Sequence, residues 1–190
     1  MPPPARATSP SRPDPALRPA PVETAPNPAG AGLLFLREEQ LRLAQDMIFF
    51  AYRDLTGAAD AVLDELGLGR AHHRVLHFVG SRPELTVSEL LGLLRITKQS
   101  LARVLGALIA RGYVLQARGA RDRRQRRLSL TEAGRVLERR LFEAQRERLV
   151  AAYREAGGPA VEGFRRVLRG LMETDTRALV EPEPNRDARR

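Results

Sequence analysis

Two helix-start signals followed by two extended segments, all within residues 86–130, limit this 190-residue chain to few folds. The stretch TVSE at 86–89 is a capping box, in which threonine and glutamate satisfy the free amides of a helix start. It predicts a short helix that runs to Leu94. Thr97 caps a second helix, which ends before Gly112. The pattern therefore predicts two helices joined by a tight turn.

The hydrophobic period then changes from helical to extended. Residues 113–118 and 126–130 are predicted strands, and the seven residues between them form a long basic tip. Thr131 caps a further helix that continues to about residue 155. Two short helices followed by a β-hairpin form a winged helix. The predicted fold class is thus mainly α: a winged helix-turn-helix, of helices plus a two-stranded β-wing.

Further helices are predicted on both sides of this core. One runs from Arg37 to Leu66, with apolar residues at alternating steps of three and four: Leu41, Ala44, Ile48, Ala51, Leu55, Ala58 and Val62. Another spans residues 70–80. After a break at residues 157–159 (Gly-Gly-Pro), a last amphipathic helix carries Val161, Phe164, Leu168, Leu171, Met172 and Leu179. Because one small domain does not need so much apolar surface, these N- and C-terminal helices are expected to form a homodimer.

The two ends of the chain have a different composition. Residues 1–32 hold 10 of the 14 prolines, so we expect residues 1–34 to be a disordered Pro-rich tail, and 181–190 a second one. The folded domain is expected over 35–180, with the winged-helix core at about 70–131. The chain has no cysteine and no apolar run of about 20 residues. We therefore expect a cytoplasmic protein without disulfides, thiolate metal sites or a membrane span.

The charge of the chain is concentrated in this core. Residues 95–127 contain ten basic residues and one acidic residue, Asp122, so this basic block has a net charge of +9, equal to that of the whole chain. The remaining residues balance to zero. A coding bias toward arginine, suggested by the single lysine at Lys98, would scatter unmatched charge along the chain. A focused positive field instead indicates a polyanionic partner such as double-stranded DNA.

The stretches ITKQSLARVLGALIARGYV (96–114) and DRRQRRLSLTEAG (122–134) resemble the MarR family of winged-helix transcription regulators. The spacing of Arg103 and Gly112, and of Asp122 and Arg124 before the LTxxG helix start, carries the resemblance. TKQSLARV is most similar to the PetP-type subgroup. The resemblance implies a homodimer on a pseudo-palindromic operator, with recognition helices in major grooves and wing tips in minor grooves. It also implies a small aromatic ligand, because many members of the family release DNA when they bind such a ligand.

Ten residues are the candidate DNA contacts: Thr97, Lys98, Gln99, Ser100 and Arg103 on the second helix, and Arg121, Asp122, Arg123, Arg124 and Arg126 on the wing. Side chains in the first turns of such a helix read base edges. Gln99 suits adenine, whereas Lys98 or Arg103 suits guanine. An exposed lysine without a role is an equally good interpretation of Lys98.

On the wing, Arg124 is the candidate for a narrow minor groove. Asp122 is expected to orient a neighbouring arginine, with a plain turn-forming aspartate as the alternative. Arg123, Arg126 and Arg127 are expected to meet phosphates rather than bases.

Other chemistry has little support in the sequence. His73 and His77 have a spacing that can bind metal, but core or pocket histidines are the simpler interpretation of His72, His73 and His77. No catalytic constellation or cofactor motif is present, so we expect neither an enzyme nor a cofactor. Two alternatives to a specific regulator stay open. They are a non-specific architectural (nucleoid-type) DNA-binding protein and a protein-interaction module.

Overall fold

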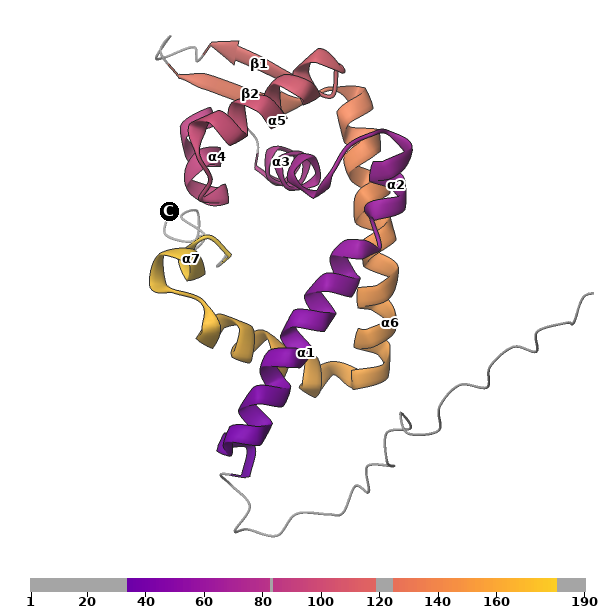
Figure 1. The fold of residues 1–190 in the computed structure, drawn as a ribbon, viewed down its shortest axis with the longest axis vertical. Coiled ribbons are helices and arrows are strands. Elements are labelled where there is room, and N and C mark those ends of the chain that lie inside the picture. Colours follow the sequence, from indigo (N-terminus) through magenta and orange to yellow (C-terminus); the bar gives the residue numbers. More distant parts are fainter. Residues whose placement is uncertain (1–33, 83, 119–124, 181–190) are drawn as a thin grey trace, which may run out of the picture. The chain divides into compact units, whose positions relative to one another are not determined.

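The computed structural model describes residues 34–82, 84–118 and 125–180. The chain divides into two units, residues 1–45 and 46–190, which are considered separately. In the first unit, a 3₁₀ turn at Leu34–Leu36 precedes the start of α1. The elements labelled in Figure 1 are α1 Glu38–Gly57, α2 Asp60–Glu65, α3 Arg70–Ser81, α4 Val87–Leu94, α5 Lys98–Ala110, β1 Val114–Arg118, β2 Arg126–Leu130, α6 Glu132–Leu171 and α7 Thr174–Ala178.

The predicted single helix from Arg37 to Leu66 is wrong, because α1 ends at Gly57 and α2 starts at Asp60. Glycine is a poor helix former, and the preceding Thr56 hydroxyl donates to the Tyr52 carbonyl at 2.8 Å, a bond that tends to bend helices. The Asp60 carboxylate is held by Arg70 at 2.6 Å. Ala59, between the two helices, is fully buried.

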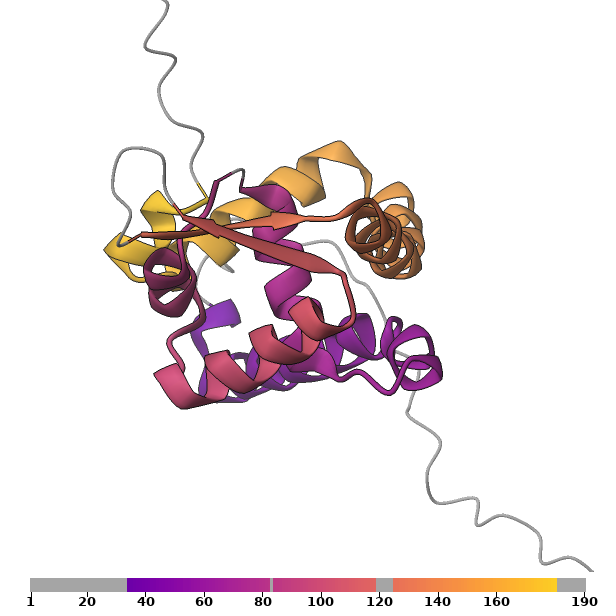
Figure 2. The same ribbon diagram turned by 90° about the horizontal axis from the view of Figure 1, so that it is seen from above.

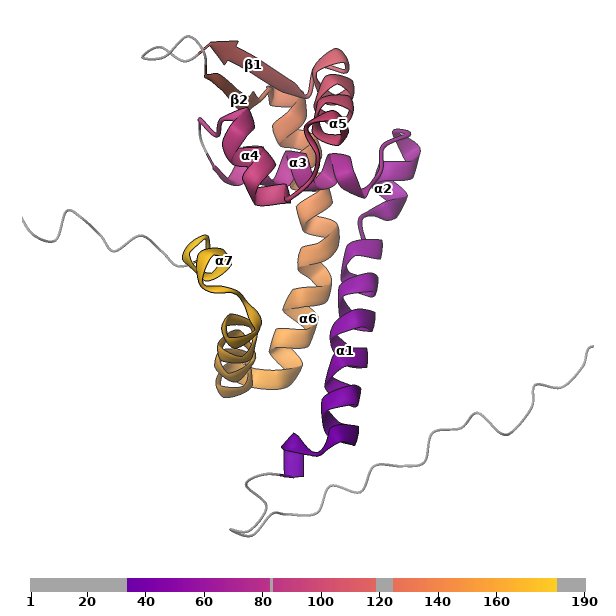
Figure 3. The same cartoon turned by 60° about the vertical axis from the view of Figure 1, so that its left-hand side comes forward.

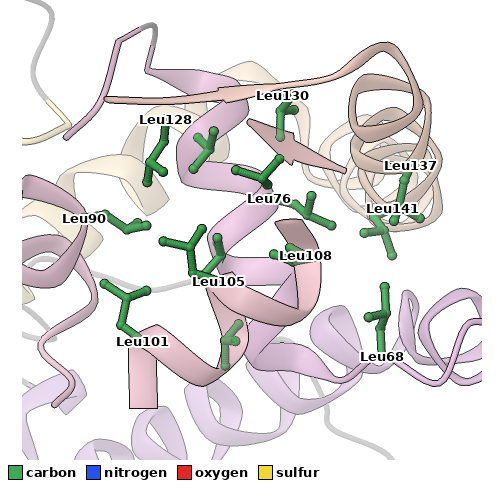
Figure 4. Close-up of a cluster of buried hydrophobic side chains, with 14 of the residues drawn as sticks. Leu68, Leu76, Leu90, Leu101, Leu105, Leu108, Leu128, Leu130, Leu137 and Leu141 are labelled. Atoms are coloured by element: carbon green, nitrogen blue, oxygen red, sulfur yellow. The ribbon is translucent and has the colours of Figure 1, made fainter. Parts of the chain in front are cut away.

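The winged-helix lobe, residues 59–141, contains the hydrophobic core. Its buried side chains are aliphatic, and no polar or charged residue of the described chain is buried with them. Leu76 of α3 and Leu108 of α5 are completely buried, and Leu128 and Leu130 of the sheet and Leu137 and Leu141 of α6 surround them (Figure 4). Burying one such leucine contributes about 2 kcal/mol.

The wing is a two-stranded antiparallel sheet, as predicted. Val114 pairs with Leu130 and Arg118 with Arg126, so the inner end of the hairpin is buried and the outer end is exposed. The segment before α4 joins the sheet through the Leu128 amide, which donates to the Leu85 carbonyl at 2.8 Å. Seen from above, the two strands pass over α3 (Figure 2).

Thr131 joins the wing to the end of α5. Its hydroxyl donates to the Gly112 carbonyl at 2.6 Å and accepts from the Gly134 amide at 2.9 Å, which confirms the predicted helix cap. Gly112 has φ +72°, the left-handed conformation that ends a helix. A Cβ on Gly134 would overlap the Tyr113 carbonyl oxygen. The glycine of the LTxxG stretch therefore allows α6 to approach the end of α5.

The predicted break in the long C-terminal helix is confirmed, since α6 is interrupted at Gly157 (φ 75°, ψ 164°). The prediction that Met172 and Leu179 belong to the helix after this break is wrong. That helix stops at Leu171, Met172 has an extended backbone (ψ 141°), and the separate α7 follows, as Figure 3 shows. The Glu173 side chain in this bend is held by an ion pair from Arg95, which favours a bend over a continued helix.

Candidate nucleic-acid interface

The first two turns of α5 present the candidate base-reading side chains to solvent. Leu101, Val104, Leu105 and Leu108 occupy the buried face of this helix. The opposite face is exposed over Lys98, Gln99, Ser100 and Arg103. The structure therefore brings these predicted residues together on one open surface of a rigid helix.

Thr97 and Ser100 serve the cap of α5 in this structure. The Ser100 amide donates to the Thr97 hydroxyl oxygen at 3.2 Å, and the Thr97 hydroxyl donates to the Ser100 hydroxyl at 2.9 Å. The Thr97 hydroxyl therefore already makes two hydrogen bonds within the protein, and the Ser100 hydroxyl makes one. Since a hydroxyl combines one donor with two acceptor positions, Thr97 can accept one more bond, and Ser100 can donate one and accept one.

Lys98 and Arg103 carry the unmatched charge of this surface. Within the described parts of the chain, no carboxylate lies within 4.0 Å of either cation, whereas ten other arginines form ion pairs. Lys98 is also the first residue of α5, where the helix dipole is positive. The result is a concentrated positive potential at the start of the exposed helix, which attracts an anion.

Three arginines of the basic block have structural partners instead. Arg95 pairs with Glu173 at 3.0 Å, and Arg127 pairs with Glu84 at 2.7 Å. Arg111 donates to the Leu66 carbonyl. Arg127 is also only one-third exposed, so the expected phosphate contact by this residue is not supported. The net charge counted over residues 95–127 does not reveal these contacts, because the partners of the three arginines are distant in the sequence.

The candidate residues Arg121, Asp122, Arg123 and Arg124 of the wing tip lie outside the described residues. Arg126, at the start of β2, is exposed and lies directly opposite the exposed Arg118 of β1. Like charges facing each other across two strands are destabilising unless an anion lies between them. Arg118 was missed as a candidate, although the length of the hairpin loop determines that it faces Arg126.

The three histidines of α3 have different surroundings. The Nδ1 atom of His72 accepts the Gly69 amide at 3.0 Å, completing the helix start, so this nitrogen is unprotonated. Burial lowers the pKa of His72 and the charges of Arg111 and Arg103 lower it further, against the opposite effect of the backbone contact with Gly69. Burial and the neighbouring His77 lower the pKa of His73, against the weaker pull of Asp60.

The ring of His77 contacts the Phe78 ring edge to face, with centroids 5.1 Å apart. Among the described residues, no three possible metal ligands lie together in a group that could hold an ion. None of the helices within residues 34–180 that the structure describes is long and apolar enough to cross a membrane.

Comparison with known proteins decides the family. The sequence profile of the MarR family matches residues 66–125, which contain α3 to β1 and the candidate wing tip. The HTH-type transcriptional regulator PetP of Rhodobacter capsulatus is 54% identical over 146 residues, covering 77% of this chain and 88% of PetP. The chain belongs to the MarR family. It is a transcriptional regulator of a DNA-binding family whose members are not enzymes.

Solved structures confirm the winged-helix fold of this MarR-family regulator. A crystal structure of MarR has a TM-score of 0.55 at 20% identity, covering 83% of this chain and 98% of that one. A MarR transcriptional regulator from Methanosarcina mazei Go1 has a TM-score of 0.55 at 22% identity, covering 66% of this chain and 84% of that one. The predicted family, its resemblance to PetP and the fold class are therefore confirmed.

Proposed function

We propose that this regulator binds a pseudo-palindromic operator as a homodimer, with one recognition helix α5 in each of two successive major grooves. The observation that carries the proposal is the exposed face of α5, which presents Lys98, Arg103 and the uncharged Gln99. Among the described residues, neither Lys98 nor Arg103 has a carboxylate partner. Bidentate pairing of Arg103 with guanine, or of Gln99 with adenine, would supply the sequence discrimination. Such a regulator would act in the cytoplasm.

The wing supplies the second contact in this proposal. Arg118 and Arg126 would share a phosphate, which offsets the repulsion between two facing arginines. Arg121, Arg123 and Arg124, which lie between the two strands in the sequence, add further positive charge, and Arg124 is the candidate for the minor groove. Asp122 would orient one of these arginines.

The homodimer is supported by apolar side chains that the single chain leaves uncovered. α1 has no buried residue, and Met47, Phe49 and Tyr52 are each at least 60% exposed. In the second part of α6, Phe164, Val167 and Leu171 recur at steps of three and four, and all three are exposed. The exposed apolar stripe of α6 and the exposed apolar side chains of α1 are the kind of surface that marks protein–protein contacts. A second copy of the chain is the occupant that a two-fold operator requires.

A small aromatic ligand that releases the protein from DNA is a further part of the proposal. An apolar groove of about 360 Å³ lies between α4, α5 and β1 and has Lys98 at its polar edge. A ligand seated there would lie beside the base-reading turn of α5. Loss of DNA affinity on addition of the ligand would support this part, whereas binding without such a loss would remove it.

The salt dependence of DNA affinity tests the interface directly. Wild-type protein is expected to lose affinity steeply between about 50 and 200 mM salt, because phosphate contacts release counterions. Arg103→Ala should weaken binding by about 1–3 kcal/mol and relax selectivity at one base pair if it reads guanine. Arg139→Ala removes the same charge from an exposed ion pair on α6 and should bind like wild type. Equal losses in both variants would mean that net charge, not α5, determines binding.

A further inference from the structure

The C-terminal helix α7 is tied to the helix-turn-helix by polar contacts from residues far away in the sequence. Arg95 Nη2 lies 3.0 Å from Glu173 Oε2 and 3.5 Å from Thr176 Oγ1. Arg82 Nη2 donates to the Leu179 carbonyl at 3.0 Å. These contacts bring α7 beneath α4, as Figures 1 and 3 both show. α7 is therefore anchored at its two ends by two arginines of the winged-helix lobe.

The first anchor lies in the turn of the helix-turn-helix. Arg95 is the C-cap of α4 and has a left-handed backbone (φ 47°, ψ 45°). Only Ile96 separates it from Thr97, the cap of α5. A left-handed conformation is uncommon for a residue other than glycine, so its side-chain partners help to maintain it. The contact with Glu173 therefore holds a residue that lies two positions before the cap of α5.

The second anchor lies at the end of α3. Arg82 is the C-cap of this helix, and its guanidinium lies over the Phe78 ring, 5.1 Å from the centroid. Between the anchors, a hollow of about 740 Å³ separates α7 from α4 and is lined by Leu85, Leu93 and Leu179. α7 has no buried residue. Polar contacts, rather than apolar packing, therefore hold this segment in place.

We propose that α7 is a clasp that positions the recognition helix for DNA binding, and that Arg95 and Glu173 are its positioning residues. Both side chains of the pair are about two-thirds exposed or more, so the clasp is weak and sensitive to salt. Arg95, although part of the basic block, then acts through α5 rather than on a phosphate. The inference rests on the proposed function, because its effect is measured on DNA binding.

Glu173→Gln tests the clasp, because charge and positioning predict opposite results. The substitution removes a negative charge, which by itself favours binding to DNA. Loss of the clasp should instead weaken operator binding by two- to five-fold, with an unchanged salt slope. Glu162→Gln makes the same change of charge in an exposed ion pair with Arg165 and should bind DNA as tightly as wild type or more tightly. If Glu173→Gln behaves like Glu162→Gln, the clasp does not position α5.

Arg95 variants distinguish positioning from phosphate contact. Arg95→Gln should weaken binding about as much as Glu173→Gln, and the double variant should be no weaker than either single one, because both remove the same contact. Arg95→Lys should restore part of the loss. A salt slope reduced by about one in Arg95→Gln would show that Arg95 meets a phosphate and would overturn its positioning role.

Hydrogen exchange of the free protein separates failure of the clasp from failure of the proposed function. In Glu173→Gln, the amides at the start of α5, including that of Ser100, should exchange faster than in wild type and in Glu162→Gln. Faster exchange in a protein that does not bind DNA would retain the clasp and reject the proposed function. Unchanged exchange, with operator binding also unchanged, would reject the clasp alone.

Discussion

Two regions of this molecule differ in whether they bury their apolar side chains. In the winged-helix lobe, Leu76, Leu108 and Leu141 are completely buried by other parts of the chain. In α1 and in the C-terminal arm, defined as residues 158–171, residues such as Phe49 and Val167 are more than 60% exposed. The core of the lobe is buried within one chain, whereas the helices on either side of it leave apolar side chains exposed, which fits the proposed homodimer. A periodic apolar pattern therefore predicts burial, but it does not indicate whether the same chain or another chain buries those residues.

The largest effect is expected where the lobe is packed most closely. Gly134→Ala would place a methyl group on the Tyr113 carbonyl oxygen and should lower the free energy of unfolding by about 3 kcal/mol or more. Gly106→Ala, in α5, is the matched control because, apart from its chain neighbours and the backbone of its own helix, nothing lies within 4 Å of its added Cβ. It should raise stability by about 0.5–1 kcal/mol through helix propensity. Chemical denaturation of both variants checks the pair, and equal effects would contradict the close approach of α6 to Tyr113.

A substitution in the C-terminal arm is expected to affect dimerisation more than the stability of the single chain. Val167→Asp would place a charge in an apolar contact between copies and should weaken dimerisation about 100-fold, which is about 2.7 kcal/mol. The far-ultraviolet circular dichroism of the lobe should not change. Sedimentation equilibrium measures the dimer dissociation constant of this variant. Arg169→Asp, at a polar position of the same arm, is the control. A monomeric wild-type protein, or a Val167→Asp variant that dimerises like wild type, would mean that the arm does not form the interface.

The smallest effect concerns the histidines of α3. The pKa values of His72 and His73 are lowered, chiefly by burial, so the unfolded chain binds protons that the folded chain does not. Stability should therefore decrease as the pH falls through about 6.5, the ordinary pKa of a histidine in the unfolded chain. His72→Asn and His73→Gln should each flatten this dependence. The double variant should flatten it most, and a pH dependence that persists unchanged there would contradict the assignment.

Local signals in the sequence predicted the lobe well. Thr86, Thr97 and Thr131 each cap the predicted helix, because a cap depends on residues within three positions of each other. The strands and the break at Gly157 also follow from local conformational preferences. The end of α1 at Gly57 was missed because the apolar pattern continues through Ala58 and Val62 into a second helix.

The electrostatics of the candidate site were only partly predictable. The exposed charges of Lys98 and Arg103 follow from the helical period, since they face away from the buried leucines of α5. The partners of Arg95 and Arg127 lie 78 and 43 residues away in the sequence, so no local pattern identifies them. A net charge summed along a sequence window therefore overestimates the number of arginines that are free to bind DNA.

Selection of the purified full-length protein on random double-stranded DNA, at about physiological salt, tests the central claim most directly. A lobe that reads bases and arms that join two copies predict enrichment of an inverted repeat, with half-sites about one helical turn apart. An enriched single half-site would contradict the role assigned to the arms. Binding without enrichment would contradict base reading by α5 and would indicate an architectural DNA-binding protein. The absence of binding would contradict the proposed interface itself.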